Sequence, residues 1–225
     1  MIIPAYNEEE SIGGVLLDTL SIMDNTNSPY EIIVVNDGST DKTGLIASAY
    51  KAVVLTNETN RGKGYSLRRA LLHARGDIIV TMDSDGEHKP KEIPDLLSPV
   101  LQGADIVSGS RFLGNGTGFT TRLNQIGNLL FNTAILFLTG KRVTDSQTGF
   151  RAINRRVLQK LNIESDGYEI ETEIAVKSLR NGFTFKEIPI SCERRKYSMS
   201  KLKIASDGTK ILKTMLKSNF SMIQH

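Results

Sequence analysis

Short apolar runs alternate with longer segments of mixed polarity through the first half of this 225-residue chain. β-Branched residues are frequent in the runs, which favours buried strands, and the segments between them are long enough to form helices. This alternation is typical of β-α-β units, which assemble into a mainly parallel sheet flanked by helices. The sequence therefore predicts an α/β fold. The expected strands are Met1–Pro4, Tyr30–Val35, Ala52–Leu55, a run from Asp77 to about Thr81, and Asp105–Arg111.

Helical patterns fill most of the remaining sequence. A further strand-like run, Phe183–Cys192, is interrupted by Pro189, and a polar loop, Thr144–Arg151, leads back towards the sheet. The expected helices run from Asn7 to about Met23, from a cap at Asp41 to about Tyr50, from the turn at 60–64 to about Ala74, from about Pro90 to Leu101, from Thr121 to Leu138 and from Glu169 to about Leu179.

Polar clusters stand at the ends of four of the predicted strands. The carboxyl ends of parallel strands share one edge of a sheet, and ligands of open α/β sheets bind beyond that edge. Turn chemistry alone would not place charged side chains at so many strand ends, so we expect the clusters to form one site. They are Tyr6-Asn7-Glu8, Asn36-Asp37-Gly38-Ser39, Asp83-Ser84-Asp85 and Ser110-Arg111.

Asp83 and Asp85 end one of these strands and are separated by a single residue. Side chains two positions apart on an extended chain point the same way, so both carboxylates can face one object. Gly86 allows a sharp turn after them, and Glu87 and His88 follow at once. Hard oxygen ligands of this kind suit Mg²⁺ or Mn²⁺ held jointly with a phosphate. The alternative is a strand-ending turn whose aspartates cap the helix that opens near Pro90.

Composition excludes several classes of protein. The formal net charge of +3 is too small to indicate a nucleic-acid binder. The single cysteine, Cys192, excludes an internal disulfide framework and favours a reducing compartment. Three scattered histidines and one cysteine offer no zinc-type spacing. No apolar run reaches the roughly 20 residues that a membrane span requires.

The end of the chain is rich in lysine and arginine. From Lys201 onward, apolar residues recur among the lysines in a cationic amphipathic pattern. This pattern fits either a solvated helix face or a segment that faces a membrane. The apolar segment Thr121–Leu138 likewise fits a core helix or a helix at a membrane surface. We therefore expect one α/β domain over residues 1–192 and a basic extension over residues 193–225.

The motifs resemble those of glycosyltransferase family 2, whose nucleotide-sugar domain has the GT-A fold. Four motifs carry the resemblance in this order: Pro4-Ala5-Tyr6-Asn7-Glu8, Asn36-Asp37-Gly38-Ser39, Asp83-Ser84-Asp85 and Gly109-Ser110-Arg111. The chain is most similar to the branch of dolichyl-phosphate mannose and glucose synthases. The loop Asp145–Phe150 is similar to that branch's polar loop, and the stretch from Arg195 to Lys201 to its closing basic motif.

The resemblance assigns roles to individual residues. It implies that Asp85, Arg111, Arg195 and Lys201 are the catalytic set, with Arg111, Arg195 and Lys201 facing the phosphates of donor and acceptor. It places Ser84 with Asp83 and Asp85 at the sugar nucleotide. The metal ligands that it implies are Asp83, Asp85 and Glu87, with Mg²⁺ or Mn²⁺ as the cofactor. The residues that it implies at the nucleoside are Pro4, Tyr6, Glu8, Val35 and Asp37.

Some positions depart from the family's pattern. Asn36 replaces the first of two aspartates that are common in the family, and Ser198 stands where a glycine is usual. Glu87 stands where relatives often carry a glutamine, which adds charge and keeps the ligand hard. Glu173 matches a family carboxylate that would position either the sugar or a basic side chain.

The function that the resemblance implies is metal-dependent, inverting transfer of a hexose from a GDP- or UDP-linked sugar to a polyprenyl (dolichyl-type) phosphate. The enzyme would work as a peripheral protein at the cytoplasmic face of a membrane. A lipid phosphate is already ionised near neutral pH, so no strong base is needed. One alternative is transfer to a saccharide hydroxyl in cell-wall or surface glycan synthesis. Another is a non-catalytic module that binds nucleotide sugars, against which the intact Asp83, Asp85 and Arg111 argue. The nucleotide and the sugar stay open.

Overall fold

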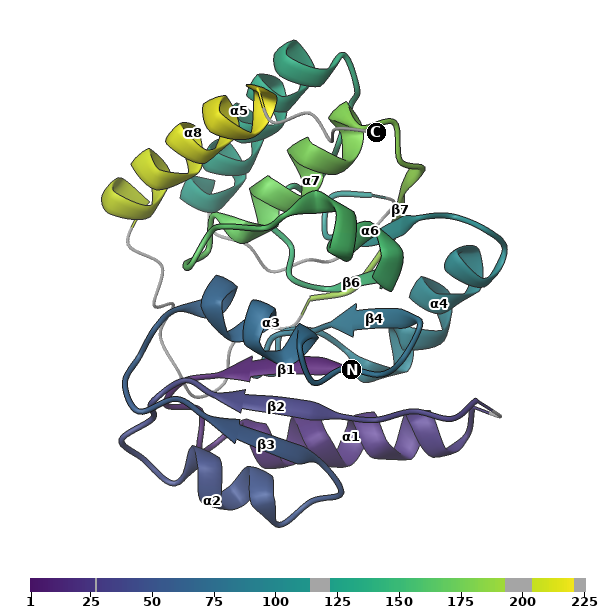
Figure 1. Cartoon of the computed structure of the whole chain (residues 1–225), viewed down its shortest axis with the longest axis vertical. Helices are drawn as coiled ribbons and strands as arrows, with labels where there is room; N and C mark the ends of the chain where they lie inside the picture. Colours follow the sequence, from purple (N-terminus) through teal and green to yellow (C-terminus); the bar gives the residue numbers. More distant parts are fainter. Residues whose placement is uncertain (27, 114–121, 193–203, 221–225) are drawn as a thin grey trace.

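A seven-stranded sheet forms the centre of the protein, with its strands in the order β3-β2-β1-β4-β6-β5-β7 (Figure 1). The computed structural model describes residues 1–26, 28–113, 122–192 and 204–220. The strands are β1 Ile2–Ala5, β2 Ile33–Asn36, β3 Val53–Thr56, β4 Ile78–Thr81, β5 Ile106–Ser110, β6 Arg151–Asn154 and β7 Phe185–Pro189. The helices are α1 Ile12–Asp24, α2 Thr43–Ser48, α3 Lys63–Leu71, the 3₁₀ turn η1 Pro90–Glu92, α4 Ile93–Leu101, α5 Arg122–Thr139, α6 Arg155–Leu161, α7 Ile170–Arg180 and α8 Ile204–Phe220.

The sheet is mainly parallel, which confirms the expected fold class. Strands β1 to β4 pair in parallel, as do β5 and β7. Strand β6 runs antiparallel to both of its neighbours, β4 and β5. Its amino end therefore lies at the same edge of the sheet as the carboxyl ends of the other strands. The loop that precedes β6 is thereby brought to the edge where ligands bind in such sheets.

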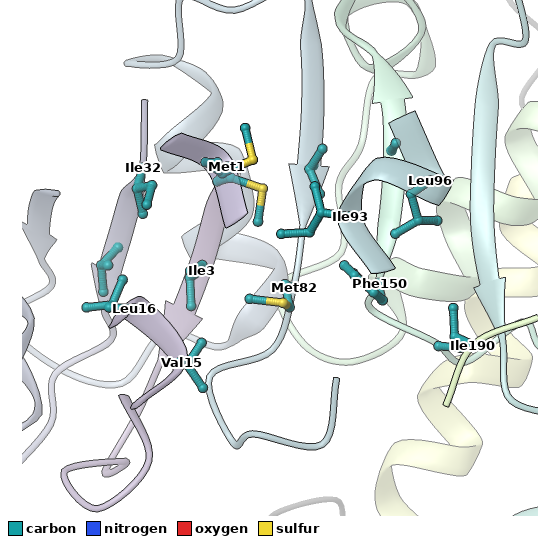
Figure 2. Close-up of a cluster of buried hydrophobic side chains, with 14 of the residues drawn as sticks. Met1, Ile3, Val15, Leu16, Ile32, Met82, Ile93, Leu96, Phe150 and Ile190 are labelled. Carbon is teal, nitrogen blue, oxygen red and sulfur yellow. The ribbon is translucent and has the colours of Figure 1, made fainter. Parts of the chain in front are cut away.

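Alternate residues of the central strands enter two different cores. Ile3 and Val80 face the layer of α1 and α4, whereas Ile2 and Ile79 face the layer of α3, α6 and α7. Figure 2 shows part of the first cluster, where Ile93 and Leu96 of α4 pack near Met82 and Phe150. Both faces of the sheet are covered, which explains why the strands read as continuous apolar runs rather than alternating ones.

A third cluster joins the last helices of the chain. Helix α8 lies beside α5, and both pack against α7 (Figure 1). The buried residues at their contact are Ile135, Val143, Ala175, Val176, Ile211 and Met215. Helix α8 is therefore anchored to the rest of the fold, and the division of the chain after residue 192 stays a prediction.

The predicted start of the first helix is wrong. Helix α1 begins at Ile12 rather than near Asn7. The backbone N–H of Glu8 donates to Thr43 Oγ1 (2.7 Å), and that of Glu9 donates to Asp41 Oδ2 (3.1 Å). Because these amides bind the first residue of α2 and the loop before it, Glu8 and Glu9 form a turn before the helix instead of its first turn.

Two other differences concern the second half of the chain. Helix α6 was not predicted; it is short and starts where Asn154 accepts a hydrogen bond from the backbone N–H of Arg156 (3.1 Å). Pro189 does not interrupt β7 but ends it. That strand is at the edge of the sheet, where a residue without an N–H is tolerated.

Candidate active site

The loops at the carboxyl edge of the sheet are tied together by side-chain hydrogen bonds. The backbone N–H of Asn7, after β1, donates to Ser39 Oγ, after β2 (3.0 Å). Ser11 Oγ lies 2.8 Å from the carbonyl oxygen of Ser84, after β4. The polar clusters that follow these three strands therefore meet, as the sequence predicted.

The loop after β1 has a fixed shape. Asn7 has a positive φ of 50°, a conformation that asparagine tolerates better than most residues. Its side chain accepts a hydrogen bond from the backbone N–H of Thr40 (2.8 Å). Glu8 is buried, and its Oε2 lies 2.9 Å from Ser11 Oγ.

The remaining predicted nucleoside residues sit in different surroundings. Pro4 and Tyr6 are half-buried near this loop. Val35 is completely buried in the core that faces α3, so its side chain belongs to the packing of the fold. A role for these three residues and Glu8 at a nucleoside stays a prediction.

Asp37 is buried and holds the loop that leads into α3. Its Oδ1 accepts hydrogen bonds from Asn57 Nδ2 (2.6 Å) and from the backbone N–H of Arg61 (2.9 Å). Its Oδ2 accepts from the backbone N–H of Gly62 (2.8 Å), which has a positive φ of 97°. Asp37 thus fixes the amino end of α3, a structural role that the sequence analysis did not foresee. Its contact with a base stays a prediction.

Asp83 is one end of a row of ion-paired side chains. The other members of the row, Lys63, Glu171 and Arg151, were not predicted as site residues. Lys63 Nζ lies 2.5 Å from Asp83 Oδ1 and 2.8 Å from Glu171 Oε1. Glu171 Oε2 in turn lies 3.0 Å from Nη1 of Arg151, whose side chain is completely buried. Burial opposes the charge of Lys63, but Asp83 and Glu171 outweigh it and raise the pKa of Lys63 above its ordinary value.

Gly149 leaves the space that the Lys63–Asp83 pair occupies. A Cβ at Gly149 would lie 2.3 Å from Lys63 Nζ and 2.8 Å from Asp83 Oδ2. Both distances are shorter than real Cβ contacts. The glycine of the polar loop before β6 is therefore explained by the close approach of this ion pair.

Asp85 is buried one residue beyond Ser84. Its Oδ1 accepts a hydrogen bond from the backbone N–H of Glu87 (3.0 Å), across a turn at Gly86, which has a positive φ of 76°. The helical segment that follows begins at Pro90 with Lys89 as its N-cap. The alternative in which the aspartates cap that helix is therefore wrong.

The site residues fit a divalent cation whose shell is completed by other ligands. Within the described ranges, no three side chains of His, Cys, Asp or Glu are arranged to hold a metal ion by themselves. Asp83 and Asp85 nevertheless supply hard oxygen donors. His88 Nδ1 is buried, has no hydrogen-bond partner among the described residues and lies 4.0 Å from Asp83 Oδ2. Such a set suits Mg²⁺ or Mn²⁺ held together with the oxygens of a diphosphate.

His88 and Cys192 lie beside the carboxylates of Asp83 and Glu87. The ring of His88 stacks on Phe150 with centroids 5.1 Å apart, and burial lowers the pKa of His88 below its ordinary value. Cys192 Sγ lies 3.9 Å from Glu87 Oε2, and burial, reinforced by Glu87, raises the pKa of the thiol to about 12. The thiol is therefore protonated near neutral pH and is a poor nucleophile.

Arg111 is held rigidly at the end of β5. Its Nε and Nη2 donate to the two carboxylate oxygens of Asp145 at 2.7 and 2.9 Å, and Asp145 is completely buried. The backbone N–H groups of Thr144 and Asp145 donate to Glu187 on β7 at 2.8 and 2.9 Å. Burial opposes the charge of Arg111, but Asp145 outweighs it and raises the pKa of Arg111 above its ordinary value. A fixed cation of this kind suits recognition of phosphate.

Glu173 positions a basic side chain and a loop. Its carboxylate lies 2.6 Å from Lys177 Nζ and accepts hydrogen bonds from the backbone N–H groups of Glu164 (3.0 Å) and Ser165 (2.8 Å). Burial opposes ionisation of Glu173, but these bonds outweigh it and hold the pKa of Glu173 below its ordinary value. Arg195 and Lys201, the other two residues of the predicted catalytic set, lie outside the described residues.

Comparisons with known proteins show what this chain is similar to. Residues 1–161 match the family model described as glycosyl transferase family 2. The chain is 33% identical over 218 residues to a dolichyl-phosphate hexose transferase of Haloferax volcanii, covering 96% of this chain and 92% of the relative. It is 31% identical over 242 residues to a UDP-N-acetylglucosamine–dolichyl-phosphate N-acetylglucosaminyltransferase of Methanococcus voltae, covering 96% and 94%. Among solved structures it resembles glucosyl-3-phosphoglycerate synthase of Mycobacterium tuberculosis in complex with Mn²⁺, UDP-glucose and phosphoglyceric acid, with a TM-score of 0.75, 25% identity and coverage of 97% of this chain and 78% of that one.

Proposed function

Because the chain belongs to glycosyltransferase family 2, we propose that it transfers a hexose from a nucleoside diphosphate sugar to a polyprenyl phosphate of the dolichyl type. The observation that carries the proposal is that two features stand at the same edge of the sheet, after β4 and after β5. The first is the Asp83-Ser84-Asp85 loop, and the second is the buried pair of Arg111 and Asp145. Two relatives whose names specify a dolichyl-phosphate acceptor match almost the whole chain.

The donor diphosphate is the part of the substrate that this site suits best. Asp83 and Asp85 are the residues that would hold a divalent cation, and Glu87 is their predicted companion. A bound Mg²⁺ or Mn²⁺ would neutralise charge on the diphosphate leaving group. The Mn²⁺ in the related synthase supports this assignment. Arg111 adds a fixed positive charge where the leaving phosphate becomes more negative.

The acceptor phosphate needs no base to attack the sugar. Its oxygen is ionised near neutral pH, and its attack on the anomeric carbon breaks the bond to the donor phosphate and inverts the configuration. The basic residues that follow Cys192 would supply charge for this phosphate. Cys192 forms an antiparallel bridge with His88 beside the site, so the residue that precedes the basic segment lies next to the site.

The outer side of α5 and α8 is the surface that we propose lies on the membrane. On α5, Ile126, Leu129, Leu130 and Phe137 are exposed, and α5 has no charged residue after Arg122. On α8, Leu212 and Leu216 are exposed beside Lys210, Lys213 and Lys217. An apolar stripe with lysines along it is the pattern of helices that rest on an anionic bilayer. No helix in the described part of the chain is apolar and long enough to cross a bilayer. We propose peripheral binding at the cytoplasmic face.

The double substitution Leu129→Ser and Leu130→Ser is expected to reduce binding to vesicles that contain anionic lipid by at least about tenfold, because burying two exposed leucines in the bilayer contributes a few kcal/mol. Co-sedimentation of protein and vesicles measures this. Binding of the unchanged protein is expected to weaken as salt rises, because salt screens the lysines of α8.

The matched control replaces two leucines elsewhere that are at least as exposed, Leu72 at the end of α3 and Leu101 at the end of α4. These substitutions are expected to leave vesicle binding unchanged. Equal losses in both double variants would show that the outer side of α5 and α8 has no special role at the membrane.

Transfer activity with a panel of donors and acceptors tests the function itself. With Mn²⁺ and a UDP- or GDP-linked hexose, we expect a labelled product on polyprenyl phosphate and less product on a saccharide or on phosphoglyceric acid. Arg195→Ala and Lys201→Ala are expected to depress lipid transfer by at least about tenfold, since each removes a charged contact to phosphate. Nucleotide affinity is expected to change much less.

Arg75→Ala is the control for lost charge, because Arg75 is exposed at the opposite edge of the sheet, before β4. It is expected to transfer at the normal rate. If Arg195→Ala and Lys201→Ala also transfer to lipid phosphate at the normal rate, and a saccharide acceptor is used in preference to lipid phosphate, the lipid-phosphate acceptor is wrong. Transfer to a saccharide hydroxyl then replaces it as the proposed function.

A further inference from the structure

Lys63 lies between a carboxylate of the proposed metal site, Asp83, and a carboxylate of the interior, Glu171. Its Nζ is 2.5 Å from Asp83 Oδ1 and 2.8 Å from Glu171 Oε1. Asp83 faces the site with a side chain that is 29% exposed, whereas that of Glu171 is only 5% exposed. Glu171 is also paired with Arg151, which lies completely buried behind it. The ammonium group therefore has one partner at the site and one in the interior.

The backbone around Lys63 is fixed, so its ammonium group can move only a short way. Lys63 is the first residue of α3, whose amino end is held by Asp37. A Cβ at the next residue, Gly64, would lie 2.1 Å from the carbonyl oxygen of Ser165, so the loop packs closely on that side as well. Gly149 leaves space for Nζ between the two carboxylates. The ammonium group of Lys63 can shift between Asp83 and Glu171 without any movement of α3.

We propose that Lys63 is a positioning residue that takes the place of a divalent cation beside Asp83 and so couples metal binding to nucleotide binding. The proposal rests on the metal-dependent function above. Without nucleotide, the ammonium group competes with an incoming cation for Asp83 and repels it. With nucleotide bound, the negative diphosphate offsets the added positive charge, and the ammonium group is retained by Glu171.

The proposal predicts opposite effects for two substitutions. Lys63→Met removes the competing charge, so Mn²⁺ is expected to bind the nucleotide-free protein at least tenfold more tightly, and added nucleotide is expected to improve Mn²⁺ binding less. Glu171→Gln leaves Asp83 as the carboxylate partner of Lys63, so Mn²⁺ binding is expected to weaken. Lys63→Met leaves Glu171 paired with Arg151, and Asp83 is partly exposed, so this variant is expected to fold.

Paramagnetic resonance of free Mn²⁺ measures these affinities without any turnover. Titrations are made on each protein alone, with UDP and with GDP. The control is Lys177→Met, which removes another buried lysine, one that pairs with Glu173 at 2.6 Å. It is expected to leave the nucleotide dependence of Mn²⁺ binding unchanged. Thermal unfolding of every variant shows whether it is folded.

Several outcomes would overturn the proposal. If the wild-type protein binds Mn²⁺ better with nucleotide but Lys63→Met binds it no more tightly than wild type, the role of Lys63 is wrong and the proposed function stands. The proposal is also wrong if Mn²⁺ affinity changes in the same direction in all three variants, Lys63→Met, Glu171→Gln and Lys177→Met. A general loosening of the fold would then explain the changes. If the wild-type protein binds no Mn²⁺ with either nucleotide, the metal assignment and the role of Lys63 fall together.

Discussion

Replacement of Asp85 by alanine is expected to lower turnover by at least about a thousandfold, because groups that stabilise charge on a leaving phosphate contribute effects of this size. The substitution removes a carboxylate that we propose binds the metal, and also the acceptor that fixes the backbone N–H of Glu87 (3.0 Å). The fold is expected to survive, since the loss of one loop hydrogen bond costs about 1 kcal/mol. Calorimetric titration of donor with and without Mn²⁺ should show that metal no longer improves donor binding.

Asp95→Ala is the matched control, because Asp95 is an exposed carboxylate near the start of α4. It is expected to bind donor and turn over normally. Should Asp85→Ala keep the metal dependence of donor binding and its normal rate, Asp85 would have to be removed from the metal site. Asp83 would then be the one carboxylate of the pair left at the cation.

Much of the fold could be predicted from the sequence because its strands are buried on both faces. Residues such as Ile79 and Val80 are neighbours in sequence yet enter different cores, so the strands appear as unbroken apolar runs. The position of β6 could not be predicted in this way. It lies between β4 and β5 and runs antiparallel to both, although it follows them in the chain. Which strands pair is decided by the packing of the whole domain, and local patterns do not contain that information.

The same limit explains which site residues were missed. Asp83 and Arg111 stand at the ends of predicted strands, so their shared edge followed from the fold class alone. Lys63 and Glu171 are far apart in sequence and meet only in the folded chain, where Glu171 also pairs with Arg151 of β6. The acidic residues Glu8 and Glu9 misled the placement of α1, because acidic residues before an apolar segment are typical both of a helix start and of a loop that caps a neighbouring one.

Replacement of Asp145 by alanine is expected to lower the free energy of unfolding by about 3–5 kcal/mol, because it leaves the guanidinium group of Arg111 buried without its counter-ion. The two side chains form a bidentate pair with distances of 2.7 and 2.9 Å, and Asp145 is 0% exposed. Urea unfolding followed by circular dichroism measures the change. Turnover should fall as well, since Arg111 loses the partner that fixes its position.

Two further variants are needed: one control at an exposed ion pair, and one that separates stability from activity at the Arg111–Asp145 pair. Arg156→Ala breaks the ion pair with Asp105 (2.9 Å), in which Arg156 is 64% exposed, and is expected to cost less than about 1 kcal/mol. The double variant Arg111→Met with Asp145→Leu replaces the buried pair with apolar side chains of similar size. It is expected to recover most of the lost stability but none of the lost turnover, because apolar side chains can fill the space but cannot attract a phosphate. Recovery of turnover in that double variant would show that Arg111 maintains the fold and does not act on the substrate.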